Sequence, residues 1–265
     1  MKKKPIKILI PSIALVLALV SFLSPSELYA EECKAYNWYC KKNDKHEIPS
    51  LDPDFSFINK YGGYYADHNV GNNDKVIYLT FDAGYENGNI EKILDSLKAH
   101  NAHGTFFILE NLINRNPELV LRMKDEGHLI CNHTAKHPDM TKITDLDNFK
   151  NQLSRLEKAY FTLTGEEMPK IYRPPEGRFS EQNLKFAHEL GYKTIFWSFA
   201  YADWDNNNQM SSDKALEKLL AHTHNGEILL LHPTSKTNAE ILDRFLSELE
   251  KEGYRFGNLN ELWAK

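Results

Sequence analysis

Ionisable or polar side chains follow five short apolar runs of this 265-residue chain. These positions are Asp82, the stretch 132–137 with its two histidines, Arg173, the pair Asp203 and Trp204, and His232. A carboxylate can act as a general base, a cationic imidazole as a general acid, and paired imidazoles can bind a divalent metal ion. Each position alone is explained as well by a helix cap or a structural polar group. Convergence of all five on one face would be a stronger signal of a catalytic site than any one position alone.

The spacing of individual residues refines this hypothesis. His133 and His137 are four residues apart, so on a helical turn their rings would point the same way and could bind one metal ion. Arg173 precedes two prolines, which hold the backbone extended and suit a guanidinium that forks onto a carboxylate. His232 ends the apolar run 227–231, so its ring would emerge from buried walls. A pair of surface histidines, a surface salt bridge and a core histidine remain the alternatives.

The elements that must position these groups alternate along the chain. β-rich runs lie at 76–81, 104–109, 128–131, 170–172, 193–198, 227–231 and 254–256. Amphipathic segments with helical spacing lie at 89–99, 117–126, 145–163, 181–190, 213–222 and 239–251. This α/β alternation predicts parallel strands with helices outside, in a barrel or an open doubly wound sheet. In both folds the chemistry gathers at the carboxyl ends of the strands.

Residues 1–30 differ from the rest of the chain. Four lysines precede the apolar run 8–23, and the segment ends at the small residue Ala30. This pattern predicts a secretory signal peptide that is cleaved after Ala30, and hence an exported protein; a retained membrane anchor is the alternative. Cleavage leaves 28 of the 32 basic and 36 of the 37 acidic residues, a net charge of −8. Such a charge does not favour nucleic acid as a partner.

The mature chain is predicted to begin with an extension, residues 31–73, that packs on a domain formed by residues 74–265. The extension is polar and rich in aromatic residues, without clear periodicity. Cys33 and Cys40 lie close together in it and could form a disulfide in an exported protein. Cys131 stands alone in a strand-like run and is predicted to be buried and inert.

The stretches TFDAG, HTAKH, RPPEG, DW and LLLH occur in the order of the five motifs of the polysaccharide deacetylases of carbohydrate esterase family 4, the NodB-homology enzymes, and resemble them. The resemblance covers residues 75–258 and implies an α/β fold, a distorted (β/α) barrel of seven or eight strands. Within the family, FDAGYENGN, RPPEGRFSE, FWSFAYADW and LLLHPTSKTNAEILD are most similar to enzymes that deacetylate N-acetylmuramic acid in peptidoglycan, leading to muramic δ-lactam in the spore cortex.

The resemblance implies a role for each site residue. It implies that Asp82 is the base, that Arg173 orients this base, that His232 is the acid and that Asp203 keeps the acid charged. His133 and His137 would be the metal ligands. Trp204 and Leu230 would form the walls for the acetyl methyl group, and the backbone N–H of Glu176 would donate to the oxyanion. A partner amidase, peptidoglycan glycan strands as substrate and a monomeric state are also expected. Arg178 could offset the acidic net charge near an anionic substrate.

Ala83 departs from the family pattern, which has an aspartate as third metal ligand at this position. Three interpretations remain: the two imidazoles bind the ion with water and substrate oxygens, Glu86 or Asn87 supplies the missing ligand, or the protein binds glycan without turning it over. We favour the first, with zinc as the default ion for paired imidazoles. N-acetylglucosamine in peptidoglycan or chitin-like chains is the alternative substrate.

Overall fold

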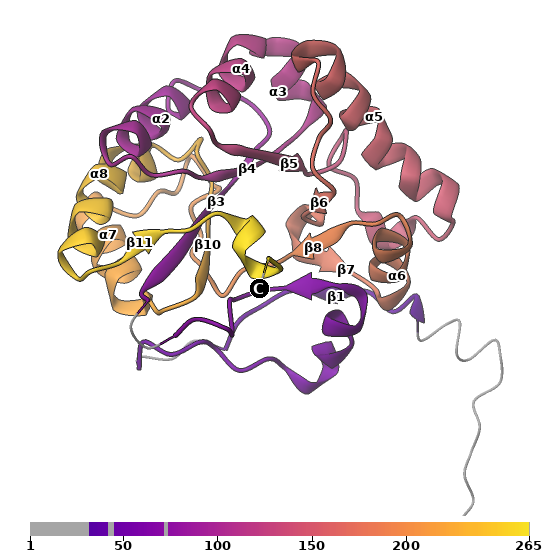
Figure 1. The fold of residues 1–265 in the computed structure, drawn as a ribbon, viewed down its shortest axis with the longest axis horizontal. Helices are drawn as coiled ribbons and strands as arrows, with labels where there is room; N and C mark the ends of the chain where they lie inside the picture. Colours follow the sequence, from indigo (N-terminus) through magenta and orange to yellow (C-terminus); the bar gives the residue numbers. More distant parts are fainter. Residues whose placement is uncertain (1–31, 42–44, 72–73, 265) are drawn as a thin grey trace, which may run out of the picture.

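A curled, parallel sheet with helices on its outer side forms the body of the computed structural model, which describes residues 32–41, 45–71 and 74–264 (Figure 1). The strand order is β2-β8-β6-β5-β4-β3-β10-β9, with β11 beside β3. The predicted signal peptide and its cleavage site lie outside the described residues. No helix within the described ranges has the length and apolar character needed to cross a membrane.

All seven predicted strands are present. The sheet contains β2 (Gly63–Tyr64), β3 (Val76–Ala83), β4 (Thr105–Ile108), β5 (Leu129–Asn132), β6 (Ile171–Tyr172), β8 (Lys193–Ile195), β9 (Phe199–Ala200), β10 (Glu227–Leu231) and β11 (Arg255–Phe256). The pairings between these strands are parallel, which confirms the predicted α/β barrel type. The sequence did not indicate β2 and β9, because a two-residue strand shows no alternation.

The six predicted helices also form, with ends shifted by a few residues. They are α2 (Ile90–Ala99), α4 (Pro117–Asp125), α5 (Leu146–Thr164), α6 (Glu181–Glu189), α7 (Ser212–His222) and α8 (Lys236–Lys251). A short helix, α3 (Glu110–Arg115), was not predicted. Local chemistry sets several ends: the Asp145, Ser180 and Ser235 side chains accept the N-terminal N–H groups of α5, α6 and α8.

The two central strands, β3 and β10, lie side by side and are almost completely buried. One face of β3 packs its apolar side chains, Leu79 and Phe81, into the core shared with the surrounding helices. A strand buried on both faces cannot shift without exposing apolar surface. Groups at the carboxyl ends of β3 and β10 are therefore held on a rigid base.

The segment before β3 packs on the domain and joins its sheet. Its first strand, β1 (Tyr36–Asn37), pairs antiparallel with β7 (Arg178–Phe179), and a 3-10 helix, η1 (Pro53–Tyr61), leads into β2. Trp38 stacks on Phe196 with ring centroids 4.4 Å apart and donates a hydrogen bond to the Trp197 carbonyl at 2.9 Å. The segment thus packs against the residues that directly follow β8.

The disulfide that Cys33 and Cys40 could form is not present in the structure, in which both are free thiols. The Cys33 Sγ donates to Gln182 at 3.3 Å, whereas the Cys40 Sγ donates to the Trp197 carbonyl at 2.8 Å. The two thiols are thus each engaged with a different part of the domain. Cys131 is buried in β5, as predicted, and burial raises the pKa of its thiol.

Glu227, at the start of β10, has a buried carboxyl group that is shielded from solvent. Its Oε2 accepts the His224 backbone N–H at 3.2 Å, while its Oε1 has no hydrogen-bond partner among the described residues. Burial raises the pKa of Glu227 to about 8, so the folded protein holds the carboxyl protonated at neutral pH.

This buried carboxyl should make stability depend on pH. The folded state keeps a proton that the unfolded chain releases above its ordinary pKa, so the contribution of Glu227 is complete below that pKa and is lost as pH rises through about 8. Glu227→Gln, which cannot ionise, should remove this dependence. Between pH 5.5 and 8.5 we expect the wild-type free energy of unfolding to fall by about 2–4 kcal/mol more than that of the variant. Urea unfolding at both pH values measures the difference, and parallel pH curves would contradict it.

Candidate functional site

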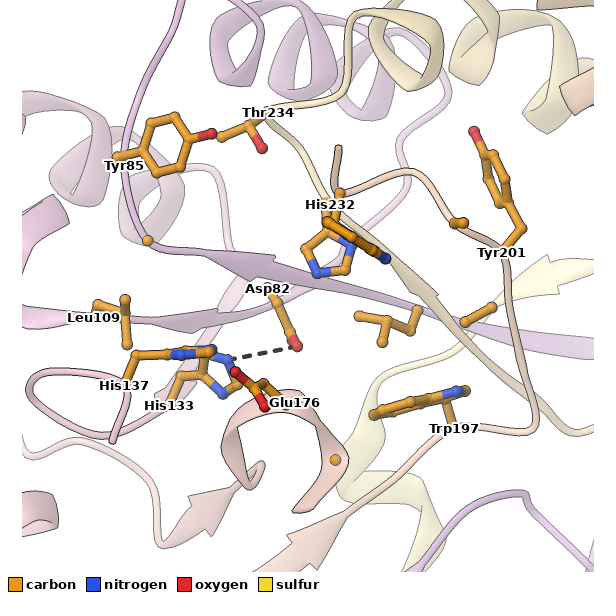
Figure 2. Close-up of a pocket in the computed structure, with 16 residues that line it drawn as sticks. Asp82, Tyr85, Leu109, His133, His137, Glu176, Trp197, Tyr201, His232 and Thr234 are labelled. Carbon is orange, nitrogen blue, oxygen red and sulfur yellow. Dashed lines mark ion pairs between the residues drawn. The ribbon is translucent and has the colours of Figure 1, made fainter. Parts of the chain in front are cut away.

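A cleft of about 810 Å³ opens at the carboxyl ends of β3 and β10 (Figure 2). Seven of the nine predicted site residues line it: Asp82, His133, His137, Glu176, Trp204, Leu230 and His232. The other two, Arg173 and Asp203, are buried behind it and contact Asp82 and His232. The sequence-based prediction that these groups converge is therefore correct.

Arg173 holds Asp82 from inside the protein rather than from its surface. The side chain of Arg173 is fully buried, and its Nη1 donates to the Asp82 Oδ1 at 2.9 Å. Its Nη2 donates to the Thr80 Oγ1 at 2.9 Å, and its Nε to the Ile195 carbonyl at 3.1 Å. The guanidinium is thus fixed by partners on several strands, which leaves one orientation for the carboxylate.

The surroundings of Asp82 also fix its charge. Burial alone would raise the pKa of this carboxyl, but the positive charge of Arg173, with contributions from His133 and His232, outweighs burial and lowers the pKa below its usual range. Asp82 is therefore ionised at neutral pH. It can accept a proton from a molecule in the cleft.

His133 and His137 lie together with ring centroids 5.0 Å apart, but the predicted helical turn is wrong. Thr134 and His137 adopt positive φ angles, 76° and 56°. The Thr134 N–H donates to the Asn132 Oδ1 at 2.8 Å, and the His137 N–H donates to the Thr134 Oγ1 at 2.9 Å. These side-chain hydrogen bonds compete with a helix and build a tight turn, which brings the rings together by another route.

His133 has the tautomer and the free nitrogen that a metal ligand needs. Its Nδ1 lies 2.9 Å from the Arg173 carbonyl and must donate to it, which leaves the lone pair on Nε2, 3.6 Å from the Asp82 Oδ2. Burial lowers the pKa of His133 to about 4, so its contact with Asp82 is not an ion pair at neutral pH. A neutral imidazole fixed by a carbonyl on its other nitrogen is the usual form of a histidine metal ligand.

Among the described residues no third side chain completes a metal site with these two rings. Ala83 packs in the apolar core, and the described residues contain no group of three His, Cys, Asp or Glu side chains placed to hold a metal ion. Glu86 accepts the N–H groups of Gly88, Asn89 and Ile90 at the start of α2, and Asn87 donates to the Thr234 carbonyl at 2.8 Å. Glu86 and Asn87 would therefore have to give up these hydrogen bonds before either could become a ligand. The two imidazoles fit a divalent ion that takes its remaining ligands from water or substrate.

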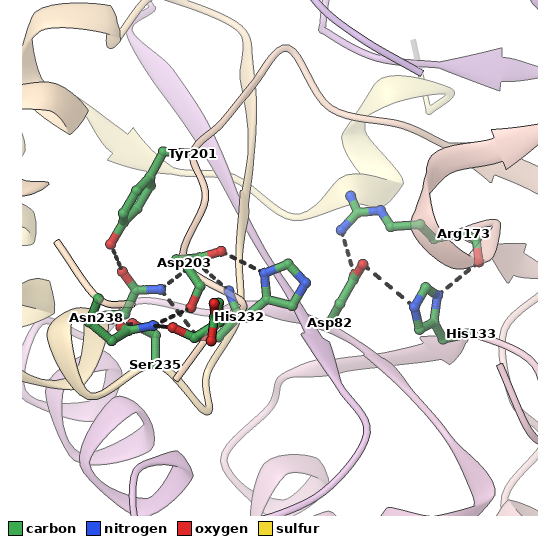
Figure 3. A network of polar contacts seen from close by, with 10 residues as sticks. Asp82, His133, Arg173, Tyr201, Asp203, His232, Ser235 and Asn238 are labelled. Carbon is green, nitrogen blue, oxygen red and sulfur yellow. Dashed lines mark hydrogen bonds and ion pairs between the residues drawn. The ribbon is translucent and has the colours of Figure 1, made fainter. Parts of the chain in front are cut away.

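His232 faces Asp82 across the cleft and is held by Asp203 (Figure 3). The His232 Nδ1 lies 2.7 Å from the Asp203 Oδ1, and the His232 backbone N–H donates to Oδ2 at 2.8 Å. Burial would lower the pKa of His232, but the charge and hydrogen bond of Asp203 outweigh it and raise the pKa above its ordinary value. His232 can therefore carry a proton on the nitrogen that faces the cleft.

The remaining predicted residues have different environments. Leu230 is buried in the cleft wall, whereas Trp204 is 64% exposed at its rim. Glu176 has a positive φ of 57° and lines the cleft. Arg178 is not among the lining residues, and its Nη2 lies 3.4 Å from the Asp139 Oδ2, so the suggested role in offsetting substrate charge is not supported.

Four residues of the candidate site were not found from the sequence: Thr80, Tyr85, Trp197 and Asn238. Thr80 shares a strand face with Asp82, two residues on, and period-two alternation could have indicated it. Tyr85 and Trp197 line the cleft. Asn238, in the first turn of α8, donates to the Asp203 Oδ2 at 2.6 Å and to the His232 carbonyl at 3.1 Å, a contact that only the folded chain creates.

Comparisons with known proteins extend over most of the chain. The polysaccharide deacetylase family profile matches residues 69–195. Peptidoglycan-N-acetylmuramic acid deacetylase PdaA of Bacillus subtilis (strain 168) is 42% identical over 228 residues, 85% of this chain and 85% of that protein. The solved structure of Bacillus subtilis PdaA, a family 4 carbohydrate esterase, has a TM-score of 0.82 at 40% identity and covers 87% of this chain and 97% of its own. A peptidoglycan-N-acetylglucosamine deacetylase of Bacillus cereus is 34% identical over 213 residues, 79% of this chain and 74% of that protein.

The charge of His232 should depend on Asp203. In Asp203→Asn the burial of the ring is opposed by the charge of Asp82 alone, so we expect the pKa of His232 to fall below its value in the wild type. NMR titration of the imidazole carbon-bound protons measures it. His100, whose pKa two surface carboxylates raise at another place, is the internal control and should not change. An unchanged His232 pKa would show that Asp203 does not set its charge.

Proposed function

The chain belongs to the polysaccharide deacetylase family, carbohydrate esterase family 4, and on this premise we propose that it removes the acetyl group from N-acetylmuramic acid residues of peptidoglycan. It is a polysaccharide N-deacetylase. The observation that carries the proposal is the opposition of an ionised carboxylate, Asp82, and a histidine of raised pKa, His232, across one cleft. Amide hydrolysis needs both a base for water and an acid for the departing amine.

Asp82 acts as the base in this proposal. Its carboxylate takes a proton from the attacking water, and Arg173 keeps it oriented toward the cleft. His133 and His137 would hold a divalent ion, zinc by default, which would supply Lewis acidity for the acetyl carbonyl and the attacking water. Two protein ligands hold such an ion less firmly than three, so its affinity should be modest.

His232 acts as the acid. After water has added to the carbonyl, the sugar nitrogen leaves only if it gains a proton, and His232 donates it from its cleft-facing nitrogen while Asp203 stabilises the cation. The backbone N–H of Glu176 is proposed to donate to the developing oxyanion. Leu230 forms a buried wall for the acetyl methyl group, with the more exposed Trp204 at the rim.

The muramic acid specificity is proposed from the motifs and from the similarity to PdaA of Bacillus subtilis. The freed amine could then cyclise with the lactyl carboxylate to a muramic δ-lactam, the modification proposed here for the spore cortex. In this proposal the protein is exported, acts as a monomer on strands that an N-acetylmuramoyl amidase has stripped of peptide, and loses residues 1–30. The similarity to a peptidoglycan-N-acetylglucosamine deacetylase supports the second candidate, deacetylation of N-acetylglucosamine.

Substrate comparison tests the proposal. We expect purified protein to release acetate from peptide-free peptidoglycan glycan, and the deacetylated residue identified by mass spectrometry to be muramic acid. Release from chitin oligomers should be slower. Deacetylated glucosamine in place of muramic acid would establish the second candidate.

Loss of the base should stop catalysis. Asp82→Asn keeps the shape of the side chain but cannot accept the proton, so acetate release should drop by about 10²–10⁴-fold. Elemental analysis of the same sample should show unchanged zinc content. If neither variant nor wild type releases acetate with zinc, manganese or cobalt added, the protein is a glycan-binding module, the interpretation that Ala83 left open.

Metal dependence should be strong and reversible. Prolonged chelation should abolish acetate release because two imidazoles retain the ion weakly, and added zinc should restore it. His137→Ala should leave protein that contains less than one tenth of the wild-type zinc after dialysis, whereas His188→Ala, outside the cleft, should keep the wild-type amount. Equal zinc content in both variants would place the ion elsewhere.

A further inference from the structure

Two aromatic side chains that line the cleft are exposed to solvent. The described residues include four large, exposed aromatic side chains, and two of them, Tyr85 and Trp204, line the cleft, with exposed fractions of 46% and 64%. The other two, Tyr39 and Phe161, do not line it. Exposed apolar groups that border a cleft indicate a ligand that covers them.

Tyr85 is held in place although its ring is open to solvent. Its hydroxyl accepts a hydrogen bond from the Asn206 Nδ2 at 2.9 Å. Asp82 and Asp203 each lie three residues before one of these partners, so the bond links the loop that follows the base to the loop that follows the carboxylate behind the acid. Tyr85 lies at the mouth of the cleft, near Thr234, in Figure 2.

The loop that carries Tyr85 is anchored on both sides of this residue. The Gly84 carbonyl accepts from the Asn111 Nδ2 at 3.0 Å, and the side chains of Asn87 and Asn89 donate to the Thr234 carbonyl at 2.8 and 3.0 Å. Hydrogen bonding by the Glu86 carboxylate to the start of α2 completes the anchorage. The loop therefore presents the Tyr85 ring at small entropic cost on binding.

The loop that carries Asn206 is anchored in a similar way. The Gln209 Nε2 donates to the carbonyls of Asp203 and Asp205, both at 2.8 Å. The Asp205 side chain accepts the Asn207 N–H at 2.9 Å, which closes the turn around Asn206. Two loops, each anchored by its own hydrogen bonds, thus meet at the bond between Asn206 and Tyr85.

We propose that Tyr85 is a binding residue for a second sugar: its ring stacks on the pyranose next to the one that is deacetylated, and Asn206 orients it. This inference rests on the proposed function. A pyranose presents a face of C–H groups that covers an aromatic ring well, while its hydroxyls stay in water at the rim. A second sugar unit at this site makes the enzyme read a glycan strand rather than a single N-acetyl sugar.

Three variants test the stacking. With a peptide-free peptidoglycan tetrasaccharide, Tyr85→Ala should raise the KM about tenfold and leave kcat within about twofold, because Tyr85 touches no reacting atom. Tyr85→Phe and Asn206→Ala keep an aromatic ring and should raise the KM by no more than about threefold. Phe161→Ala, which removes a ring of similar exposure on α5, should behave as wild type. Thermal unfolding checks that all four variants are folded.

A small competitor locates the effect at the second sugar. N-acetylmuramic acid monosaccharide should inhibit wild type and Tyr85→Ala with the same inhibition constant, since it fills only the position at the reacting groups. If Tyr85→Ala matches wild type on the tetrasaccharide, the proposal is wrong. The proposal is also wrong if Tyr85→Phe loses as much as Tyr85→Ala, because the hydroxyl and not the ring would then bind.

Calorimetric binding separates this proposal from the proposed function. One outcome is that wild type binds the tetrasaccharide but releases no acetate, and that Tyr85→Ala binds it about tenfold more weakly. This outcome would contradict the deacetylase function and support the second sugar position. If wild type releases acetate and Tyr85→Ala binds the tetrasaccharide as tightly as wild type, the deacetylase function would be supported and the second sugar position contradicted. Wild type that neither binds nor deacetylates the tetrasaccharide would overturn both.

Discussion

The buried pair of Arg173 and Asp82 is the interaction on which the site depends. A guanidinium with no exposed surface must satisfy all its donors within the protein, because an unpaired buried charge is costly. It does so by bonding to the Asp82 carboxylate, to Thr80 and to backbone carbonyls at the end of β8 and just beyond it. The same contacts that satisfy Arg173 fix the orientation and the ionisation of the base.

The same pair also orients the side of the cleft where His133 and His137 are proposed to bind a metal ion. The Arg173 carbonyl holds the Nδ1 of His133, so one residue orients both the base through its side chain and an imidazole through its backbone. The segment before β3 supports this arrangement from below, since Trp38 stacks on Phe196, whose carbonyl also accepts from Arg173. The N-terminal extension therefore contributes to the geometry of the active site without lining it.

The two sides of the cleft have opposite electrostatic environments. Asp82 is kept ionised by positive neighbours, while His232 has its pKa raised by Asp203. Burial opposes the charged form of both groups, and in both the main opposing contribution is an opposite charge at hydrogen-bond distance, Arg173 for Asp82 and Asp203 for His232. Asn238 links Asp203 to the His232 carbonyl and so ties the acid to α8 (Figure 3). The proposed base and the proposed acid therefore each have the charge state that amide hydrolysis requires before substrate binds.

The sequence by itself determined the seven strands and six helices with clear periodicity, and the five strand ends that carry the site residues, because burial on a sheet or a helix imposes a regular spacing. It also indicated the family, through five short motifs that the structure brings together in and behind one cleft. It did not determine how His133 and His137 meet, because the hydrogen bonds of Asn132 and Thr134 produce positive φ angles that no periodicity reveals. Nor could it indicate Asn238 or the link between Tyr85 and Asn206, whose partners are far apart in the chain. Such contacts exist only once parallel strands bring their carboxyl ends together, so the tertiary structure alone decided them.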